Sequence, residues 1–292
     1  MRIVTHNGSF HADEVFAVAA LKLKFKNENV EIIRTRDPKI LATADLVVDV
    51  GALYDGERFF DHHQGGIEPR SNGVPYASFG LVWKRFGAEI CDSEEIAKRI
   101  ETELILHIDA ADNSVEVYKP IIPGVYPYIL HDIVHSFYPL WDDTTLDYDS
   151  GFEQALGFAT IVLDREMAQI GAVFRARPIF KKFYESAHNK KIILLDRKCS
   201  YEEFLPEYPE ILFVISPNQA DDTWHVKTAR DSIYSFENRK SFPESWAGKR
   251  GNELVLATGV SDAIFCHRGR FLTVAGSKEG ALALAELATK EK

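Results

Sequence analysis

Three short segments near the start of the chain combine imidazole and carboxylate side chains. They are residues 6–13 (His-Asn-Gly-Ser-Phe-His-Ala-Asp), 47–51 (Val-Val-Asp-Val-Gly) and 59–64 (Phe-Phe-Asp-His-His-Gln). Four of the ten histidines of the chain lie in these segments. Carboxylates and neutral imidazoles that converge on one place can form a site for two divalent cations. The three segments therefore predict a metal-dependent hydrolase.

The first segment offers His6, His11 and Asp13 as metal ligands. Gly8 lies between the two histidines, and a glycine lets the backbone turn so that both imidazoles can face one centre. Capping of the helix that follows is the alternative role for His11 and Asp13, because an aspartate near a helix start is common.

The other two segments add a carboxylate and a histidine pair. Asp49 is the fourth residue of the run Leu-Val-Val-Asp-Val, which is typical of the end of a strand buried on both faces. A buried carboxylate is costly unless it binds a metal or accepts structural hydrogen bonds, so both roles stay open for Asp49. In an extended chain His62 and His63 point to opposite sides, so only one of them is expected to share a metal with Asp49. Asp61 is expected to orient a liganding imidazole.

A fourth acidic segment follows in the predicted helical region. Asp109 and Asp112 are three residues apart and are therefore neighbours on a helix. One of them is expected to complete the shell of the second metal, and a solvated acidic face is the alternative. Mixed His and Asp ligands favour manganese, zinc, iron or cobalt over calcium, and magnesium fits if waters fill its shell.

The hydrophobic pattern predicts the elements that hold these residues. Strands are expected at 2–5, 30–35, 45–50 and 57–61, and helices at 12–26, 77–87, 93–107 and 149–186, the last broken or bent near Gly171 and Pro178. Strand, helix, strand and strand in this order suggest an α/β sheet with parallel pairs. Such sheets bind ligands beyond the carboxyl ends of their strands, where the metal candidates lie.

The pattern changes near residue 190 and predicts a second domain. Short β-like runs occur at 191–195, 211–216, 223–228, 254–258, 263–267 and 270–275, before a last helix at 278–289. We therefore expect an α/β protein with an N-terminal catalytic domain over residues 1–187, which has a mainly parallel sheet and a helical linker. A smaller C-terminal α+β domain that binds substrate is expected over residues 188–292.

Composition and motifs exclude several classes of protein. The 292 residues are 46% hydrophobic and 27% charged, as in a soluble globular protein, and no run approaches the roughly 18 apolar residues of a membrane span. The three cysteines are widely spaced, so neither a disulfide framework nor a zinc-thiolate site is expected, and the cytoplasm is the expected compartment. The net charge of −10 is unlike that of a duplex-coating protein. Neither a Gly-x-Ser-x-Gly elbow nor a His-Glu-x-x-His helix is present.

Taken together, these segments resemble the DHH-type phosphoesterases. The match is closest to the melanocyte-proliferating-gene (Myg) branch, whose members include RNA exonucleases. It rests on residues 6–13, 47–51 and 61–64, with further similarity at 34–38, 78–82, 109–113, 246–248 and 278–282, and so spans nearly the whole chain. The chain departs from the branch at 267–270, where related members have a small, Gly-rich sequence, at Ser114 in place of a glycine, and at the loosely matching residues 138–141.

The resemblance implies two domains with a dinuclear centre, usually of manganese, at their interface. It places six residues at metal-binding positions, with Asp49 as the bridge between the ions: His6, His11, Asp13, Asp49, His62 and Asp109. It also matches His63 to a residue that contacts the substrate phosphate.

The expected function is hydrolysis of a phosphoester at the end of a single-stranded RNA or a short oligonucleotide. Two divalent cations are the expected cofactors, with Mn²⁺ ahead of Mg²⁺, Zn²⁺ and Co²⁺, and Asp49, Asp61 and His63 are the expected catalytic residues. A second phosphate is expected to bind Arg268, Arg270 and Lys278, with a solvated basic surface as the alternative. Tyr76, Phe79 and Trp141 are candidates for stacking a base, with a core role as the alternative.

Two other functions stay open at this point. One is a pyrophosphatase or dinucleotide phosphohydrolase, which would use the same metals in a shorter cleft. The other is a metal-binding protein without turnover, in which no coordination position is left for water. No membrane partner is expected, and a homodimer is compatible with the sequence.

Overall fold

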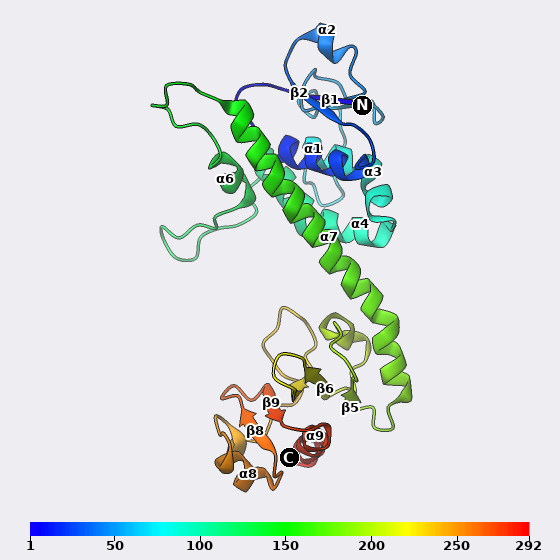
Figure 1. Cartoon of the computed structure of the whole chain (residues 1–292), viewed down its shortest axis with the longest axis vertical. Coiled ribbons are helices and arrows are strands. Elements are labelled where there is room, and N and C mark those ends of the chain that lie inside the picture. The colour runs from blue at the N-terminus through cyan, green and yellow to red at the C-terminus, as the bar shows by residue number, and fades with distance from the viewer. Residues whose placement is uncertain (292) are drawn as a thin grey trace. The chain divides into compact units, whose positions relative to one another are not determined.

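The computed structural model describes residues 1–291 and separates into two compact units, Met1–Gly171 and Ala172–Lys292. Helix α7 (Tyr148–Ser186) contributes residues to both units (Figure 1). The domain organisation expected from the sequence, with a boundary after residue 187, stays a prediction.

A parallel four-stranded sheet forms the centre of the first unit. Its order is β2-β1-β3-β4, and its strands are β1 (Arg2–Thr5), β2 (Glu31–Arg34), β3 (Leu46–Val48) and β4 (Phe59–Phe60). Every neighbouring pair is parallel, with Val4 opposite Val47 and Val48 opposite Phe60. Parallel strands align their carboxyl ends at one edge, so the residues that follow β1, β3 and β4 meet there. The predicted α/β class with parallel pairs is confirmed.

Seven helical segments accompany this sheet before α7. They are α1 (Ala12–Lys24), α2 (Pro38–Leu41), α3 (Ser78–Cys91), α4 (Glu94–Ile100), the π-helical turn η1 (Glu101–Ile105), α5 (Leu106–Asp112) and α6 (Leu130–His135). Helices α1 and α3 pack together, with the rings of Phe16 and Phe79 5.7 Å apart. The single helix predicted at 93–107 consists of three consecutive segments, α4, η1 and α5, and continues to Asp112.

The second unit contains a mixed five-stranded sheet in the order β5-β6-β7-β9-β8. The strands are β5 (Ile192–Leu194), β6 (Phe213–Asn218), β7 (Thr223–Thr228), β8 (Ala263–Cys266) and β9 (Leu272–Ala275), and only β5 and β6 pair in parallel. The helical segments are η2 (Glu202–Glu207), η3 (Glu244–Trp246), α8 (Asn252–Thr258) and α9 (Lys278–Lys290). This arrangement agrees with the α+β pattern expected after residue 190.

One prediction about secondary structure was wrong, and another is only partly decided. The strand expected at 254–258 is part of helix α8, which begins after Gly251 (φ +47°) and ends at Gly259 (φ +74°). A short apolar run does not distinguish a buried strand from a buried helix, whereas a glycine with positive φ is a common helix end. For the helix expected at 149–186, a break or a bend was expected near Gly171 and Pro178. Helix α7 is one continuous helix of 39 residues with Pro178 inside it, so the helix is not broken there, and a bend stays a prediction.

The aromatic residues considered for base stacking differ in their surroundings. Phe79 is fully buried in the core, and the Tyr76 ring lies 3.9 Å from the Arg70 guanidinium carbon. Trp141, in contrast, is 91% exposed. Within residues 1–291, no helix combines the length and the apolar character that crossing a bilayer requires.

Candidate metal centre

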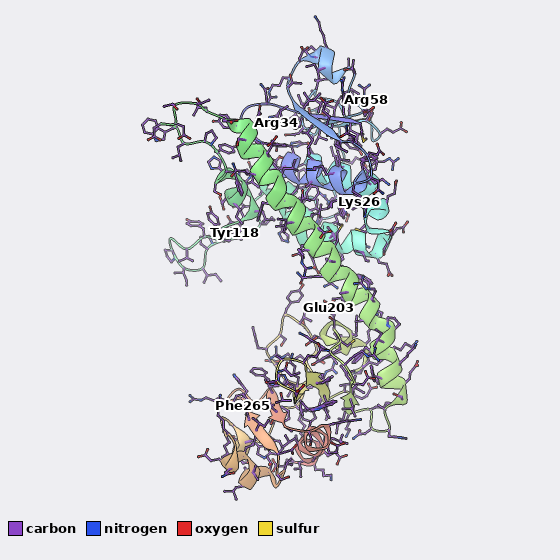
Figure 2. All side chains as sticks on the ribbon, in the orientation of Figure 1. Lys26, Arg34, Arg58, Tyr118, Glu203 and Phe265 are labelled. Carbon is purple, nitrogen blue, oxygen red and sulfur yellow. The ribbon has the colours of Figure 1, made fainter. Side chains whose placement is uncertain are left out.

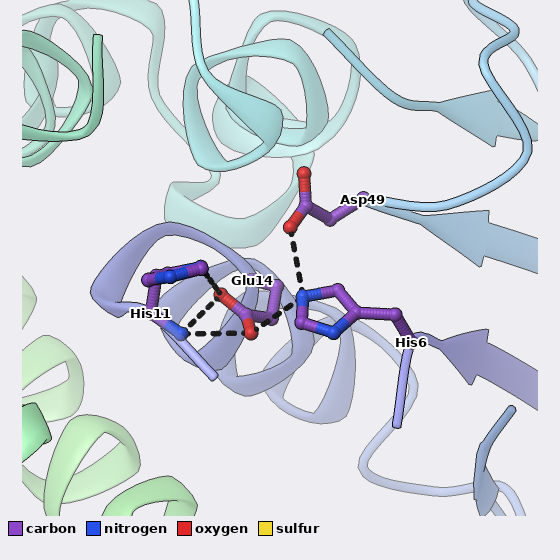
Figure 3. A group of neighbouring side chains, drawn as sticks. All are labelled: His6, His11, Glu14 and Asp49. Carbon is purple, nitrogen blue, oxygen red and sulfur yellow. Dashed lines mark hydrogen bonds and ion pairs between the residues drawn. The ribbon is translucent and has the colours of Figure 1, made fainter. Parts of the chain in front are cut away.

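The loop after β1 brings His6 into the interior of the first unit. His6 is 3% exposed, and its Nε2 lies 3.0 Å from Glu14 Oε1 and 3.2 Å from Asp49 Oδ2 (Figure 3). The turn that follows needs Gly8, whose φ is +84°. Arg34, labelled in Figure 2, holds this turn because its Nη2 donates to the Gly8 carbonyl at 2.6 Å while its Nη1 pairs with Asp149.

Glu14 connects the start of α1 to both loop histidines. Its side chain is fully buried, and its two oxygens accept from the backbone N–H of His11 at 2.8 Å (Figure 3). The His11 Nδ1 atom is 4.0 Å from Glu14 Oε2, and the ring is 44% exposed. The carboxylate of Glu14 therefore lies beside two imidazoles, in the position of a further ligand.

Asp49 lies between the two halves of the site. It follows β3 with a left-handed backbone (φ 57°), a conformation that costs energy in most non-glycine residues and recurs at functional sites. Its Oδ2 contacts His6, and its Oδ1 accepts a hydrogen bond from the Ser78 hydroxyl at 2.8 Å. The same Oδ1 lies 3.4 Å from His62 Nε2. This central position is the one expected of a bridging carboxylate.

His62 and His63 both approach Asp49, which differs from the expectation that they diverge. Their ring centroids are 4.4 Å apart, and His63 Nδ1 lies 3.5 Å from Asp49 Oδ1. The expectation was wrong because β4 ends at Phe60, so the chain is no longer extended at these residues. Asp61 holds His63, since its Oδ1 lies 2.8 Å from Nδ1 and accepts from the backbone N–H at 3.0 Å. The prediction that Asp61 orients an imidazole agrees with this contact.

Asp13 and Asp112 lie near the same nitrogen of His62 that approaches Asp49. The His62 Nε2 atom is 3.2 Å from Asp112 Oδ2 and 3.8 Å from Asp13 Oδ2. Asp13 is fully buried; its Oδ2 accepts from the Ser78 backbone N–H at 3.2 Å, while its Oδ1 has no hydrogen-bond partner in residues 1–291. A buried carboxylate oxygen without a donor is rare and costly, so an unpaired oxygen here favours a cation as its partner.

Electrostatics in the site also favour bound positive charge. Burial raises the pKa of Asp13 well above its usual range, and the negative charges of Asp49 and Asp112 raise it further. Burial alone would lower the pKa of His6, but hydrogen bonds to Asp49 and Glu14 outweigh it and raise that pKa to about 10. The pKa of His62 is raised to about 10 in the same way, against its burial, by Asp112 and Asp49. Hydrogen bonds from the same two imidazoles lower the pKa of Asp49, against its burial. In the metal-free site, protons on the imidazoles thus balance the negative charge of the carboxylates, and divalent cations would compete with these protons.

Three overlapping groups of side chains have the spacing that a metal ion needs. They are His6-His11-Glu14-Asp49, Asp49-His62-His63 and His11-Asp13-Asp112, and in each group one ligand atom per residue lies within 4.8 Å of the others. Donor atoms around a cation with bonds of 2.0–2.2 Å lie about 3.0–3.4 Å apart, which matches the contacts of His6 and His62. The residues present therefore fit a divalent cation.

Asp109 lies outside these groups, although the resemblance places it at a metal position. Its Oδ2 pairs with Arg70 Nη2 at 2.7 Å, and its Oδ1 accepts from the Gly80 N–H at 3.1 Å. Burial raises the pKa of Asp109 to about 7, although the contact with Arg70 opposes that shift. Of the two acids considered on α5, the structure brings Asp112 to His62 and pairs Asp109 with an arginine.

The residues proposed to bind a second phosphate all lie in the second unit. Arg268 is exposed in the turn between β8 and β9, and Arg270 in the same turn has φ 56° and donates from Nη1 to the Phe242 carbonyl at 3.4 Å. Lys278 is exposed at the start of α9, where Ser277 caps the helix. Their role in binding substrate stays a prediction.

Two residues of the site were not among the ligands expected from the sequence. Glu14 resembles an ordinary acidic residue in the first turn of a helix, and only its position three residues after His11 hinted at a shared role. His131 was not considered; it lies at the start of α6, and its ring stacks on that of His11 with centroids 6.0 Å apart and planes at 10°. It adds an imidazole at the edge of the group formed by His11, Asp13 and Asp112.

Comparison with known proteins assigns the chain to a family. The family profile MYG1_exonuc, described as uncharacterised protein family UPF0160, matches residues 2–289. The MYG1 protein YER156C of Saccharomyces cerevisiae is 30% identical over 321 residues, which cover 98% of this chain and 95% of the yeast protein. The human MYG1 exonuclease is 30% identical over 322 residues, with 97% and 84% of the two chains covered.

A solved structure, the pGpG-specific phosphodiesterase PggH from Vibrio cholerae, aligns over 99% of both chains with a TM-score of 0.32 and 14% sequence identity. The family assignment rests on the sequence matches alone. Because the profile match spans nearly all residues and the yeast and human relatives are 30% identical across almost the whole chain, the chain belongs to the MYG1 exonuclease family.

Proposed function

We propose that this protein is a metal-dependent phosphodiesterase that removes nucleotides from the end of single-stranded RNA or of short oligonucleotides. Membership of a family whose human, bovine and rat members are named exonucleases supports a phosphoester hydrolase. The observation that carries the metal requirement is the buried, unpaired Oδ1 of Asp13, a carboxylate whose other oxygen lies 3.8 Å from His62 Nε2. Assignment to the wider DHH-type phosphoesterases is part of the same proposal.

Two cation positions follow from the side-chain groups. His6, His11 and Glu14 would hold one ion, with Asp49 as the shared ligand. Asp13 and Asp112, which share a group with His11, would hold the other ion together with His62, whose Nε2 lies 3.8 Å from Asp13, 3.2 Å from Asp112 and 3.4 Å from Asp49. Divalent ions in such a pair lower the pKa of a water molecule and neutralise the charge of a phosphate. A ligand set of imidazoles and carboxylates without thiolates suits Mn²⁺, and Mg²⁺, Zn²⁺ or Co²⁺ are the alternatives. Asp109 would not bind either ion but would hold α5 in place through its contacts with Arg70 and Gly80.

Ser78 positions the two central carboxylates. Its hydroxyl donates to Asp49 Oδ1 at 2.8 Å, and its backbone N–H donates to Asp13 Oδ2 at 3.2 Å. Ser78 is the first residue of α3, where the backbone N–H groups have no partner within the helix and the helix dipole favours negative charge. The start of α3 therefore fixes the orientation of both aspartates and leaves Asp13 Oδ1 free for a ligand.

His63 is suited to contact the substrate phosphate. Its side chain is 62% exposed, whereas that of Asp61 is 3% exposed. Asp61 accepts from the Nδ1–H, and its Oδ2 is itself held by the Ala52 N–H at 2.6 Å. This arrangement fixes the ring through Nδ1, so Nε2 is the ring nitrogen suited to contact a phosphoryl oxygen.

The proposal can be tested with the full chain, stripped of metal and reloaded with Mn²⁺. A panel of pyrophosphate, short oligonucleotides and long single strands would be compared for hydrolysis, with the length profile of the products. We expect short single strands to be shortened from one end, and Asp49→Asn to abolish this activity. The control is Asp37→Asn, because Asp37 is an exposed helix cap that asparagine can replace.

The outcomes separate the three candidate functions. Turnover of pyrophosphate alone would favour the pyrophosphatase alternative over the exonuclease. Absence of any hydrolysis by metal-loaded protein would favour a binding protein without turnover. Full activity of the Asp49→Asn variant in Mn²⁺ would contradict the assignment of Asp49 as the shared ligand.

A further inference from the structure

The first unit contains a cavity that none of the metal-ligand candidates lines. It has a volume of about 910 Å³ and is bounded by η1, α5, α6 and the irregular segment 114–129. Three tyrosines of that segment line it: Tyr118, which is labelled in Figure 2, Tyr126 and Tyr128. Cavities of about 300–1,000 Å³ hold ligands of the size of most cofactors and drugs, so this cavity can hold a small planar molecule.

The three rings expose apolar surface without covering one another. Tyr118, Tyr126 and Tyr128 are 42%, 65% and 72% exposed, and none stacks on another aromatic ring within residues 1–291. Tyr128 is held in place by its hydroxyl, which donates to the Asp132 carbonyl at 3.3 Å. Neighbouring apolar side chains are exposed as well, such as Ile122 at 64%. An exposed patch of this kind on a folded unit usually marks a binding site.

The cavity adjoins the candidate metal centre through two residues. Ala111 lines it from α5, and the next residue, Asp112, contacts His62 at 3.2 Å. His131 also lines it, and its ring stacks on that of His11. A molecule in the cavity would therefore lie beside the second cation position and within the same unit.

The charge of the lining indicates which part of a substrate would enter. Its charged side chains are Glu103, Glu116 and Lys119, and it also contains the two histidines His107 and His131. A lining with two carboxylates and one ammonium does not attract a phosphate. Exposed tyrosine rings next to a phosphate site instead suit a flat, uncharged aromatic group, and a nucleobase has a face that stacks on tyrosine whatever its identity.

We propose that this cavity binds a nucleobase of the substrate strand while the neighbouring phosphodiester lies at the metal centre. The inference rests on the proposed function, because it assumes that the substrate phosphate binds at the cation held by His62 and Asp112. It adds that the substrate is recognised by stacking and without a preference for one base. Pyrophosphate carries no base and would gain nothing from the cavity, so oligonucleotides are the substrate class that uses it.

A binding experiment with a matched pair of double variants tests this inference. Tyr126→Leu/Tyr128→Leu removes both rings but keeps apolar side chains, and Tyr126→Phe/Tyr128→Phe keeps the rings. The full-length proteins are titrated in Mn²⁺ with a fluorescent five-nucleotide strand that carries hydrolysis-resistant phosphorothioate linkages. A strand with the same linkages but abasic residues serves as the ligand without bases. Thermal midpoints of all variants are measured, and the exposure of both side chains leads us to expect little change.

The expected result is a loss of affinity that depends on the bases. Stacking of one base typically contributes enough to change affinity about 5- to 150-fold, so the Leu variant should bind the normal strand at least about 10-fold more weakly than the wild type. The Phe variant should bind like the wild type, and all proteins should bind the abasic strand equally weakly. Equal binding of the normal strand by the wild type and the Leu variant would overturn the inference, as would a wild type that binds both strands alike or neither.

The binding result and the proposed function can fail separately. A wild type that hydrolyses no oligonucleotide but binds it through the tyrosines would refute the exonuclease and leave the base site standing. Hydrolysis of oligonucleotides at the same kcat/KM by the wild type and the Leu variant would refute the base site and leave the exonuclease standing.

Discussion

Bound Mn²⁺ should stabilise the first unit strongly. The variant Asp13→Asn should be at least as stable as the wild type without metal, but less stable than the wild type with Mn²⁺. In the metal-free protein, Asp13 is a buried carboxylate whose pKa is raised by burial and then by Asp49 and Asp112. Asparagine keeps an oxygen that can accept from the Ser78 N–H and removes one of these like charges. Its amide can also donate to the Asp112 carboxylate. We therefore expect the metal-free variant to be at least as stable as the metal-free wild type.

Metal binding reverses this order. A cation that binds only the folded protein adds about 2.7 kcal/mol to the free energy of unfolding at a concentration of 100 times its Kd. For a unit of this size, 1 kcal/mol shifts the Tm by roughly 2–4 °C, so the wild type should gain about 5–11 °C. The Asp13→Asn variant lacks the anionic ligand and should gain much less at the same Mn²⁺ concentration.

Differential scanning calorimetry over a series of Mn²⁺ concentrations measures both quantities, with chelator as the metal-free reference. The reasoning predicts that the Tm values of wild type and variant cross as metal is added. If Asp13 were only a structural hydrogen-bond acceptor, the variant would be destabilised in chelator and in Mn²⁺ alike. A variant that keeps the full metal-induced shift would refute the assignment of Asp13 as a ligand.

Two further substitutions, one of them with a matched control, test the residues that support the site. Gly80→Ala should lower the free energy of unfolding by about 3–5 kcal/mol in a denaturant titration, since its Cβ would lie 1.9 Å from Asp109 Oδ2 and break a buried ion pair. Gly157→Ala, where a Cβ meets nothing within 4 Å, should instead raise that free energy by up to about 1 kcal/mol. Ser78→Ala removes the 2.8 Å hydrogen bond to Asp49 and should raise the Mn²⁺ concentration needed for half of the Tm shift by about 10–100-fold. An unchanged half-shift concentration would show that Asp49 does not need this donor.

The position of the site could be predicted from the sequence because it follows from strand ends. The apolar runs that end before His6 and Asp49 lie in strands that are buried except for Arg2, and parallel pairing places the residues after them at one edge. Local sequence patterns were enough to predict these strand ends, because a continuous apolar run is typical of a buried strand. The turn after the first strand needs only the positive φ of Gly8. The direction of the His62 and His63 side chains could not be predicted, because it depends on where β4 ends.

The choice between Asp109 and Asp112 shows which information the local sequence lacks. Both acids lie on α5 three residues apart, so helical spacing makes either one a plausible ligand. What separates them is Arg70, which comes from a loop 39 residues earlier, and Gly80, whose missing side chain leaves room for the Asp109 carboxylate. Asp109 also accepts a hydrogen bond from the Gly80 N–H, which ties α5 to α3. These contacts of Asp109 set the rotation of α5 that turns Asp112 toward His62. An arginine and a glycine outside the metal centre thus determine which acid can reach it, and only the tertiary contacts contain that information.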